Sequence, residues 1–199
     1  MPRPAGFDRN EVLERAARLF WDRGYCATSV SDLVQATRLR PGSLYAAFDS
    51  KEGLLLAALD HYGSRSLENV RRILTDNGGA LAGIVAFLDL LVAEGGGGRR
   101  DPRGCFLVNT ALEVAPHNER VRRHVRRYLR AIERAFADAF RAAVAGGELE
   151  PAADPARMAG HLMATVWGIR VMQRLGTRRS GLRAVVDEYL RGLGLAPGP

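Results

Sequence analysis

The stretch TSVSDLVQATRLRPGSLYAAFDSK, residues 28–51, decides the fold of this chain of 199 residues. Its apolar residues have helical spacing in two short segments, Val30, Leu33 and Val34 in the first and Leu44 and Phe48 in the second. Thr28 or Ser29 can cap the first helix, and Pro41 favours the start of the second. Because only residues 37–39 separate the two segments, the pattern is typical of a helix-turn-helix, whose second helix enters the major groove of DNA.

The polar positions of this pair of helices are the predicted DNA contacts. Hydroxyl groups and a phenol can reach phosphates, a glycine lets the backbone approach the groove, and a cation at a helix start attracts an anion. The predicted contacts are Thr28, Ser29, Ser31, Arg40, Pro41, Gly42, Ser43, Tyr45, Ala46 and Lys51. An ordinary helical hairpin with a polar face is the alternative on spacing alone.

Residues 24–54 read G-Y-x-x-T-S, then a helix, then P-G-S-L-Y-A-A-F-D-S-K-E-x-L. This pattern resembles the DNA-binding module of the TetR/AcrR family of bacterial repressors. The resemblance implies a palindromic operator as the partner and a homodimer formed through the last two helices. Arg38 stands where the family usually has a glycine in the turn, so we expect a left-handed or otherwise adjusted conformation there. Ala47 replaces a frequent aromatic residue or histidine, which removes one possible contact with DNA.

The composition agrees with a nucleic-acid partner without being specific for one. The net charge is +7, and among 29 basic residues Lys51 is the single lysine, at the position where the resembled family uses lysine against a phosphate. Two distant cysteines imply no disulfide framework, which favours a reducing compartment. The N-terminus lacks the apolar core of a signal peptide, and no apolar run approaches the ~20 residues of a membrane span. A soluble, cytoplasmic bacterial protein without a membrane partner is expected.

The rest of the chain predicts helices only, because no segment alternates with the period of a strand. The predicted helices cover residues 8–23, 50–74, 81–94, 105–114, 117–144, 155–175 and 181–193, besides the two short ones. The fold class is therefore all-α, with about nine helices. We expect a helix-turn-helix DNA-binding domain over residues 1–52 and a helical effector-binding and dimerisation domain over residues 53–199.

Two of these helices leave more than one interpretation open. The helix over 155–175 carries apolar residues on more than one face, which favours packing against a second copy of the chain, although a purely intramolecular core is the alternative. Seven arginines lie between Arg120 and Arg134. A solvated helix face explains them better than a second nucleic-acid surface, because an apolar stripe already accounts for the helix.

Catalytic and metal-binding patterns are missing from the sequence. Its four histidines lack the spacing of a helical metal site, and it contains no Cys-x-x-Cys, phosphate loop, dinucleotide fingerprint or nucleophile elbow. We therefore expect no metal, no cofactor, no catalytic residues and no enzymatic activity.

Cys105 is the candidate sensor. The segment RGCFLVNTALEVAP, residues 103–116, is similar to one in the branch of the family that includes repressors sensing electrophiles through a cysteine. Arg99, Arg100 and Arg103 precede Cys105, and neighbouring cations favour the reactive thiolate form of a cysteine. A small buried hydrophobe is the alternative, and Cys26 is expected to be structural.

A small-molecule pocket is the other possible effector site. Aromatic walls with a few polar groups are typical of ligand cavities, although the same residues can form an ordinary core. The candidates, besides Cys105, are Phe87, Leu91, Phe106, Asn109, Glu113, Met163, Trp167 and Arg170. The resemblance thus predicts a repressor released from its operator by a small molecule or by modification of Cys105. A helical ligand-binding or enzymatic protein without DNA-binding activity is the alternative.

Overall fold

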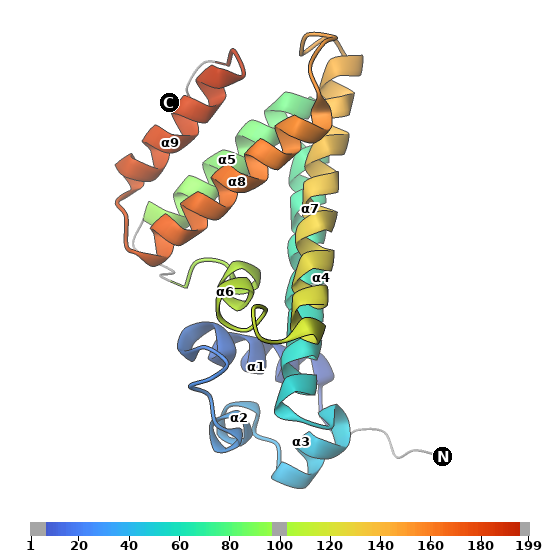
Figure 1. The fold of residues 1–199 in the computed structure, drawn as a ribbon, viewed down its shortest axis with the longest axis vertical. Coiled ribbons are helices and arrows are strands. Elements are labelled where there is room, and N and C mark those ends of the chain that lie inside the picture. Colours follow the sequence, from blue (N-terminus) through green and yellow to red (C-terminus); the bar gives the residue numbers. More distant parts are fainter. Residues whose placement is uncertain (1–6, 97–102, 196–199) are drawn as a thin grey trace. The chain divides into compact units, whose positions relative to one another are not determined.

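The computed structural model describes residues 7–96 and 103–195, and within these residues every regular element is an α-helix (Figure 1). The nine helices are α1 (Arg9–Arg23), α2 (Val30–Thr37), α3 (Pro41–Phe48), α4 (Lys51–Thr75), α5 (Ala80–Gly96), α6 (Phe106–Glu113), α7 (Glu119–Ala145), α8 (Pro155–Arg174) and α9 (Arg179–Gly192). The predicted all-α class and the number of helices are confirmed. The last helix begins two residues earlier than the predicted residue 181.

The chain forms two compact units, each made of two separate stretches of sequence. The first unit comprises Met1–Ser66 and Cys105–Tyr128, and the second comprises Leu67–Gly104 and Leu129–Pro199. Helices α4 and α7 each contribute residues to both units. In these compact units α6 and the start of α7 belong with α1–α3 rather than with the later helices. The division by function into residues 1–52 and 53–199 stays a prediction.

Buried apolar side chains hold α1, α2 and α3 together in the first unit. Phe20 of α1, Leu33 of α2 and Leu44 of α3 are each at most 2% exposed. The residues Ala16, Phe48, Leu54 and Leu55 add to this core. An isolated helix of eight residues is marginal in water, so α2 and α3 depend on this burial for their stability.

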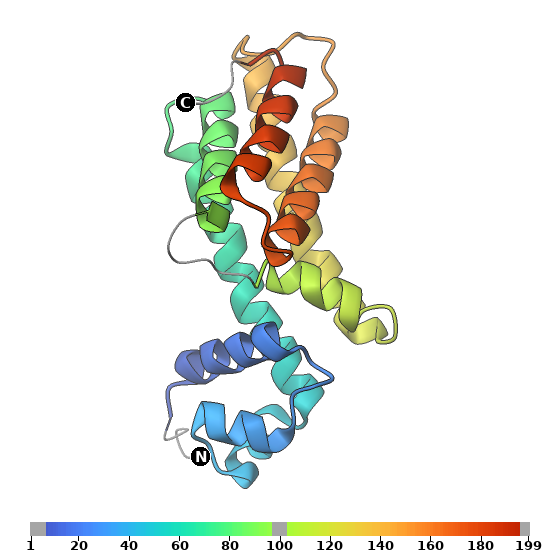
Figure 2. The same ribbon diagram turned by 90° about the vertical axis from the view of Figure 1, so that its left-hand side faces the viewer.

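The second unit is a helical bundle in which α9 packs alongside α5 and α8 (Figure 2). Its core is apolar and includes Ile84, Leu88, Phe136, Phe140 and Leu182, all fully buried. Glu148 closes one end of this bundle, because its carboxylate accepts hydrogen bonds at 3.1 Å from the first two backbone N–H groups of α5. Such donors have no partner within their own helix.

Candidate nucleic-acid interface

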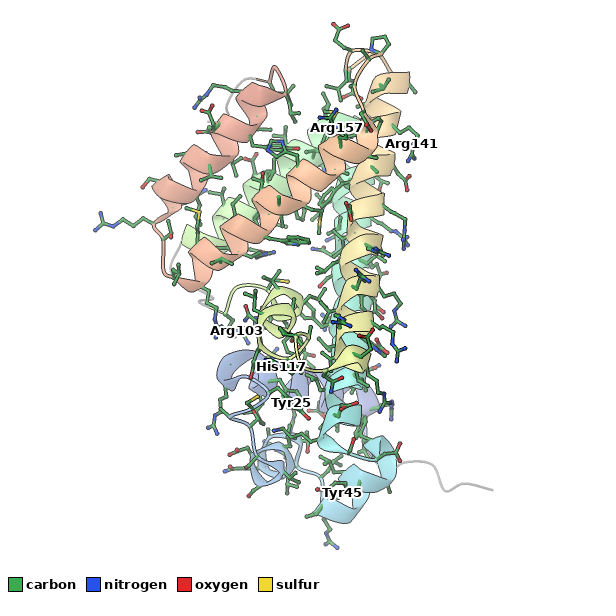
Figure 3. The ribbon with its side chains drawn as sticks, viewed as in Figure 1. Tyr25, Tyr45, Arg103, His117, Arg141 and Arg157 are labelled. Atoms are coloured by element: carbon green, nitrogen blue, oxygen red, sulfur yellow. The ribbon has the colours of Figure 1, made fainter. Side chains whose placement is uncertain are left out.

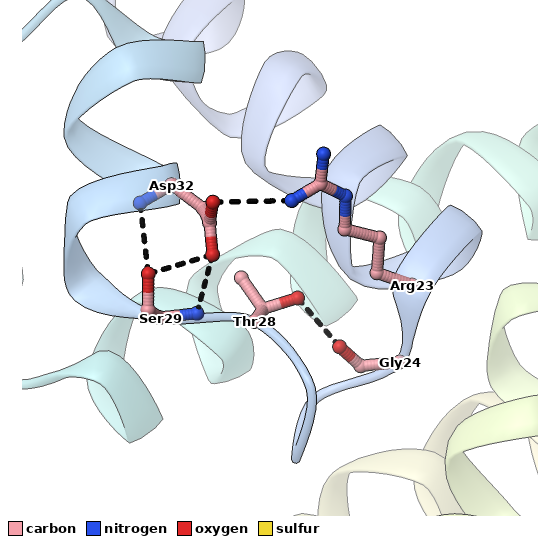
Figure 4. Close-up of polar contacts among 5 residues, drawn as sticks. All are labelled: Arg23, Gly24, Thr28, Ser29 and Asp32. Carbon is pink, nitrogen blue, oxygen red and sulfur yellow. Dashed lines mark hydrogen bonds and ion pairs between the residues drawn. The ribbon is translucent and has the colours of Figure 1, made fainter.

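Helix α2 is fixed at its first turn by a reciprocal capping box (Figure 4). The Ser29 Oγ accepts a hydrogen bond from the backbone N–H of Asp32 at 3.1 Å. In return the Asp32 carboxylate accepts from the Ser29 N–H at 2.8 Å and from the Ser29 hydroxyl at 2.6 Å. Arg23, the last residue of α1, pairs with the same carboxylate at 3.1 Å. These contacts satisfy donors at the start of α2 and tie α1 to it.

Thr28 serves the turn between α1 and α2. Its side chain is 1% exposed, and its hydroxyl donates a hydrogen bond of 2.6 Å to the carbonyl oxygen of Gly24 (Figure 4). Gly24 has a φ of +85°, in the region that favours glycine. The Thr28 hydroxyl, predicted to contact a phosphate, therefore donates its hydrogen bond within the protein. Ser29 and Ser31 are both exposed.

The turn between α2 and α3 contains Arg38 in the left-handed conformation, with φ 59° and ψ 20°. The expected left-handed turn at this position is therefore present. The Thr37 hydroxyl donates to the Leu33 carbonyl at 2.6 Å and accepts from the Leu39 N–H at 3.4 Å. These bonds end α2 and direct the chain toward Pro41, the first residue of α3.

Helix α3 has one buried face and one exposed face. Leu44 and Phe48 face the core at 0% and 4% exposure. The predicted contact residues on α3 and its N-cap all lie exposed: Arg40, Pro41, Gly42, Ser43, Tyr45 and Ala46. Figure 3 places Tyr45 on the outer side of α3, and its side chain is 44% exposed. A Cβ atom at Gly42 would meet no atom within 4 Å, so packing within the protein does not require glycine there.

The start of α4 lies next to the end of α3. The Ser50 Oγ accepts a hydrogen bond of 2.9 Å from the Gly53 N–H and so caps α4. A Cβ atom at Gly53 would lie 2.0 Å from the carbonyl oxygen of Phe48, so only glycine allows the two helices to approach this closely. The Nζ of Lys51 lies 4.3 Å from the centroid of the Tyr25 ring. A capped helix start with a cation attracts an anion such as a phosphate.

Two arginines lie at the N-terminal end of α3. Arg38 and Arg40 are exposed, and neither has an acidic partner among residues 7–96 and 103–195. Together with Lys51 they place positive charge on the residues that border α3. Phosphate contacts position a protein on duplex DNA, and arginine and lysine side chains are among the groups that make them.

The predicted effector residues divide between the two units. Phe87, Leu91, Met163, Trp167 and Arg170 belong to the second unit. Phe87, Leu91 and Met163 are buried in its core, with the Phe87 ring 5.0 Å from that of Phe136. Trp167 is 41% exposed, and Arg170 pairs with Glu94 at 2.7 Å. The first three residues have the environment of an ordinary core.

Helix α8 also buries a polar residue that the sequence analysis missed. The Gln173 side chain is 5% exposed, donates a hydrogen bond of 2.6 Å to the Leu91 carbonyl, and accepts one of 3.1 Å from Arg170. Gln173 therefore joins α8 to α5 by a buried bond. A single glutamine in an apolar helix is a weak signal in the sequence.

Cys105, Phe106, Asn109 and Glu113 belong to the first unit. Cys105 is half-buried at the N-cap of α6, and its Sγ lies 3.9 Å from the Tyr62 hydroxyl. The Phe106 ring packs edge-on against Tyr62, with centroids 5.7 Å apart, and lies 6.3 Å from the ring of Trp21. The thiol thus borders an aromatic cluster of Trp21, Tyr62 and Phe106, of which the sequence analysis identified only Phe106.

Of the arginines expected near Cys105, Arg99 and Arg100 lie outside the described residues. Arg103, which Figure 3 labels, accepts a hydrogen bond of 3.1 Å through its carbonyl oxygen from Arg174. Cys26 is exposed rather than buried, although the sequence analysis assigned it a structural role. The Glu113 carboxylate accepts hydrogen bonds from two backbone N–H groups, those of Tyr25 and Cys26.

The described part of the chain shows neither a metal site nor a membrane span. Among these residues no three histidine, cysteine, aspartate or glutamate side chains gather as metal ligands. No helix there has the length and apolar character needed to cross a membrane.

A short exposed helix, held by a tight turn against supporting helices and bordered by cations that have no acidic partner in the described part of the chain, defines a helix-turn-helix DNA-binding protein. Comparison with known proteins agrees. Residues 12–58 match the model for bacterial regulatory proteins of the tetR family, and residues 81–189 match the tetracyclin repressor-like C-terminal domain. The chain belongs to the TetR family of transcriptional regulators, and it is a regulator rather than an enzyme.

Individual relatives support this assignment over nearly the whole chain. The transcriptional repressor ComR of Escherichia coli K12 is 30% identical over 95% of this chain and 90% of its own length. A cysteine-substituted variant of the TetR family regulator CifR, in complex with a 26-base-pair operator, is 35% identical with a TM-score of 0.86, covering 96% of this chain and 100% of that one. The reduced form of Escherichia coli NemR has a TM-score of 0.85 over 92% of this chain and 95% of its own, but at 20% identity it is similar in fold alone.

We predict that Ser29→Ala lowers the free energy of unfolding by about 1 kcal/mol, because the first turn of α2 loses its cap. Hydrogen bonds from the Ser29 hydroxyl and backbone N–H, helped by Arg23, hold the pKa of Asp32 below its usual value of 3.8. A lowered pKa adds stability that is fully present above the usual value and is lost as the pH falls through the lowered one. The difference between the two proteins should therefore shrink in acid.

Urea unfolding at a series of pH values measures this difference. Ser31→Ala is the matched control, because Ser31 is also exposed in the first turn of α2 but has no partner among the described side chains. Equal losses for both serines would contradict the capping role of Ser29.

Proposed function

We propose that this regulator is a homodimeric repressor that binds a palindromic operator through α3 and leaves it when the helical body is modified or binds a ligand. The observation that carries the proposal is the exposed face of α3, where Arg40, Ser43 and Tyr45 stand clear of the core that holds Leu44 and Phe48. The repressor named ComR and the operator-bound CifR are similar over nearly the whole chain, which supports the same role here.

On the operator, each α3 would enter a major groove. Arg40 and the hydroxyls of Ser43 and Tyr45 would contact phosphates or base edges, while Gly42 and Ala46 would let the helix backbone come close. Lys51 would contact a phosphate from the start of α4. In a two-fold dimer the two copies of α3 would lie about 34 Å apart, one turn of the duplex.

The second copy would pack on α8. Trp167 and Val171 are 41% and 40% exposed, and their spacing of four residues places them on one face of α8. Leu175, the C-cap residue that follows α8, is 79% exposed. An exposed apolar stripe of this kind marks a surface that is covered by a partner. We propose that α8 and α9 of two chains form the dimer interface, with residues 1–52 acting in DNA binding and residues 53–199 in effector binding and dimerisation.

For the effector, we favour modification of Cys105. The Cys105 thiol is half-buried at the N-cap of α6, and its Sγ lies 3.9 Å from the Tyr62 hydroxyl, so a group added by alkylation or oxidation would displace α6. Displacement of α6 and tilting of α4 would change the distance between the two copies of α3, so that they no longer fit successive major grooves. Release of this kind requires a coupling free energy of about 1 to 3 kcal/mol, or roughly 5- to 150-fold in affinity. A small molecule bound near Trp167 and Arg170 is the second candidate.

We predict that Lys51→Ala and Tyr45→Phe both weaken operator binding. The operator is first selected from random duplex DNA, and affinities are then measured by gel shift at several salt concentrations. Loss of one phosphate contact in each subunit should reduce the slope of log affinity against log salt by about 2 for Lys51→Ala. Gly42→Ala should bind less well without loss of stability, because the protein has space for a Cβ there. Arg141→Ala, an exposed arginine on α7, is the control. Unchanged affinities for Lys51→Ala and Tyr45→Phe would rule out this docking.

We predict that N-ethylmaleimide releases the wild-type protein and Cys26→Ser from the operator but does not release Cys105→Ser. The two variants are matched, because the chain has only these two cysteines and each variant keeps one. Release is followed by fluorescence anisotropy of labelled operator, and the modified residue is identified by mass spectrometry. Normal release of Cys105→Ser would exclude Cys105 as the sensor.

We predict that Val171→Glu converts the dimer into a folded monomer, because a carboxylate would be buried without a partner at the α8 surface. Light scattering after size-exclusion chromatography gives the mass, and circular dichroism checks the helix content. Leu112→Glu on α6 is the control, since Leu112 is an exposed leucine outside α8. If Val171→Glu and Leu112→Glu are both dimers, the interface does not include Val171.

A further inference from the structure

The last residue of α6 is joined to the turn that follows α1. Glu113 Oε2 accepts a hydrogen bond from the Tyr25 N–H at 3.1 Å, and Glu113 Oε1 accepts one from the Cys26 N–H at 2.9 Å. Both carboxylate oxygens are therefore used by main-chain groups that are almost 90 residues away in sequence. Gly24 makes room for this contact, because a Cβ there would lie 2.9 Å from Glu113 Oε1. Glu113, predicted as an effector residue, thus holds this turn through its carboxylate.

The Tyr25 side chain of this turn contacts Lys51, the predicted DNA-binding lysine. The Tyr25 ring, whose backbone Glu113 holds, lies under the Lys51 ammonium at 4.3 Å from the ring centroid. A cation over an aromatic ring is attracted by the electron-rich face of the ring, which favours one position of a flexible lysine. On its other side, the Tyr25 carbonyl accepts a hydrogen bond from the Thr28 N–H at 3.3 Å, just before the cap of α2. The position of Tyr25 thus affects both Lys51 and the entry to α2.

The opposite end of α6 carries Cys105. Its Sγ lies 3.9 Å from the Tyr62 hydroxyl, and the adjoining Phe106 is 2% exposed among aromatic rings. Helix α6 contains eight residues, so about 12 Å separates the thiol end from the Glu113 end. A helix this short moves as one body, because its hydrogen bonds connect every turn. A group added at Cys105 would therefore displace Glu113 as well.

We propose that Glu113 is a positioning residue that couples α6 to the DNA-binding surface by holding the Tyr25–Cys26 turn and, through the Tyr25 ring, the Lys51 ammonium. In its clamped state the lysine is ready for a phosphate. Loss of the clamp leaves the lysine and the start of α2 without a fixed position, and operator affinity falls. The proposal rests on the proposed function and adds to it the contact through which the state of α6 reaches DNA.

The position of Glu113 fits a coupling role better than a purely stabilising one. Its side chain is exposed, and hydrogen bonds in contact with water add little to the free energy of unfolding. A bond that contributes little to stability can still select between two positions of a turn. For this reason we expect Glu113→Ala to fold, and the experiment to report on coupling.

The test is a double-mutant cycle with Lys51, measured as operator affinity by fluorescence anisotropy. Glu113→Ala alone should weaken binding by roughly 5-fold or more, in the range of a coupling between sites. In the Lys51→Ala background the same change should have a markedly smaller effect, because the residue that it positions is gone. Glu113→Gln keeps one acceptor oxygen and should give an intermediate affinity. Glu119→Ala removes an exposed glutamate that pairs with Arg122 in the same unit, and it should behave as wild type.

Two further readouts separate coupling from a loss of structure. Hydrogen exchange should show faster exchange of the Tyr25 and Cys26 amides in Glu113→Ala, with unchanged protection of the α1 core. Treatment with N-ethylmaleimide should lower the operator affinity of the wild type but change that of Glu113→Ala very little, because the clamp is already open.

Each failure has a distinct signature. If the wild-type protein binds no selected duplex, the proposed function is wrong and the clamp has no role to play. If the wild type and Glu113→Ala bind the operator equally well, the positioning role is wrong while the proposed function stands. The same conclusion follows if Glu113→Ala lowers operator affinity by the same factor in the wild-type and Lys51→Ala backgrounds. A wild type that binds but ignores N-ethylmaleimide removes the thiol from the scheme, and the Lys51 cycle still decides the role of Glu113.

Discussion

The close approach of α3 and the start of α4 is the constraint on which the DNA-binding surface depends. Gly53 allows it, because any larger residue would place a Cβ 2.0 Å from the Phe48 carbonyl oxygen. The contact fixes Phe48 and Leu44 in the core, where each buried side chain contributes about 1.5–3 kcal/mol. Since α3 has only eight residues, this burial rather than its own helix propensity keeps it folded. The exposed face of α3 is held in place by what lies behind it.

Much of this arrangement could be predicted from the sequence. The two short helices, a cap at Thr28 or Ser29 and an unusual backbone at Arg38 follow from local rules that relate residue type to backbone conformation, and the structure assigns the cap to Ser29 and the left-handed conformation to Arg38. The alternation of Leu44 and Phe48 with polar residues also predicted which face of α3 is exposed, and the structure agrees. These features depend on residues that are close together in the sequence, where residue type and apolar spacing are informative.

Contacts between distant segments could not be predicted in this way. Glu113 had the polarity expected of a ligand-binding group, and in the structure it accepts hydrogen bonds from the backbone N–H groups of Tyr25 and Cys26. Every residue except proline has such a backbone group, so the amino-acid sequence does not indicate which ones a distant carboxylate will bind. Phe87, Leu91 and Met163 had the composition of a pocket and lie in the core of the second unit. The spacing of apolar residues on a helix is the same whether they line a cavity or pack in a core. Periodicity predicts which face of the helix is buried but not what packs against that face.

The first compact unit is discontinuous in sequence, and this limits how the protein can be divided. Gly63 of α4 lies against the ring of Tyr128, Asn118 donates a hydrogen bond of 2.8 Å to Glu52, and Val121 and Val125 are buried. A fragment cut after Ser66 would keep the whole helix-turn-helix but expose the surfaces that α6 and α7 cover. A chimera that transfers a DNA specificity between this chain and another regulator should therefore exchange only the residues of α3. The contacts of α6 and α7 with the rest of the first unit are then kept.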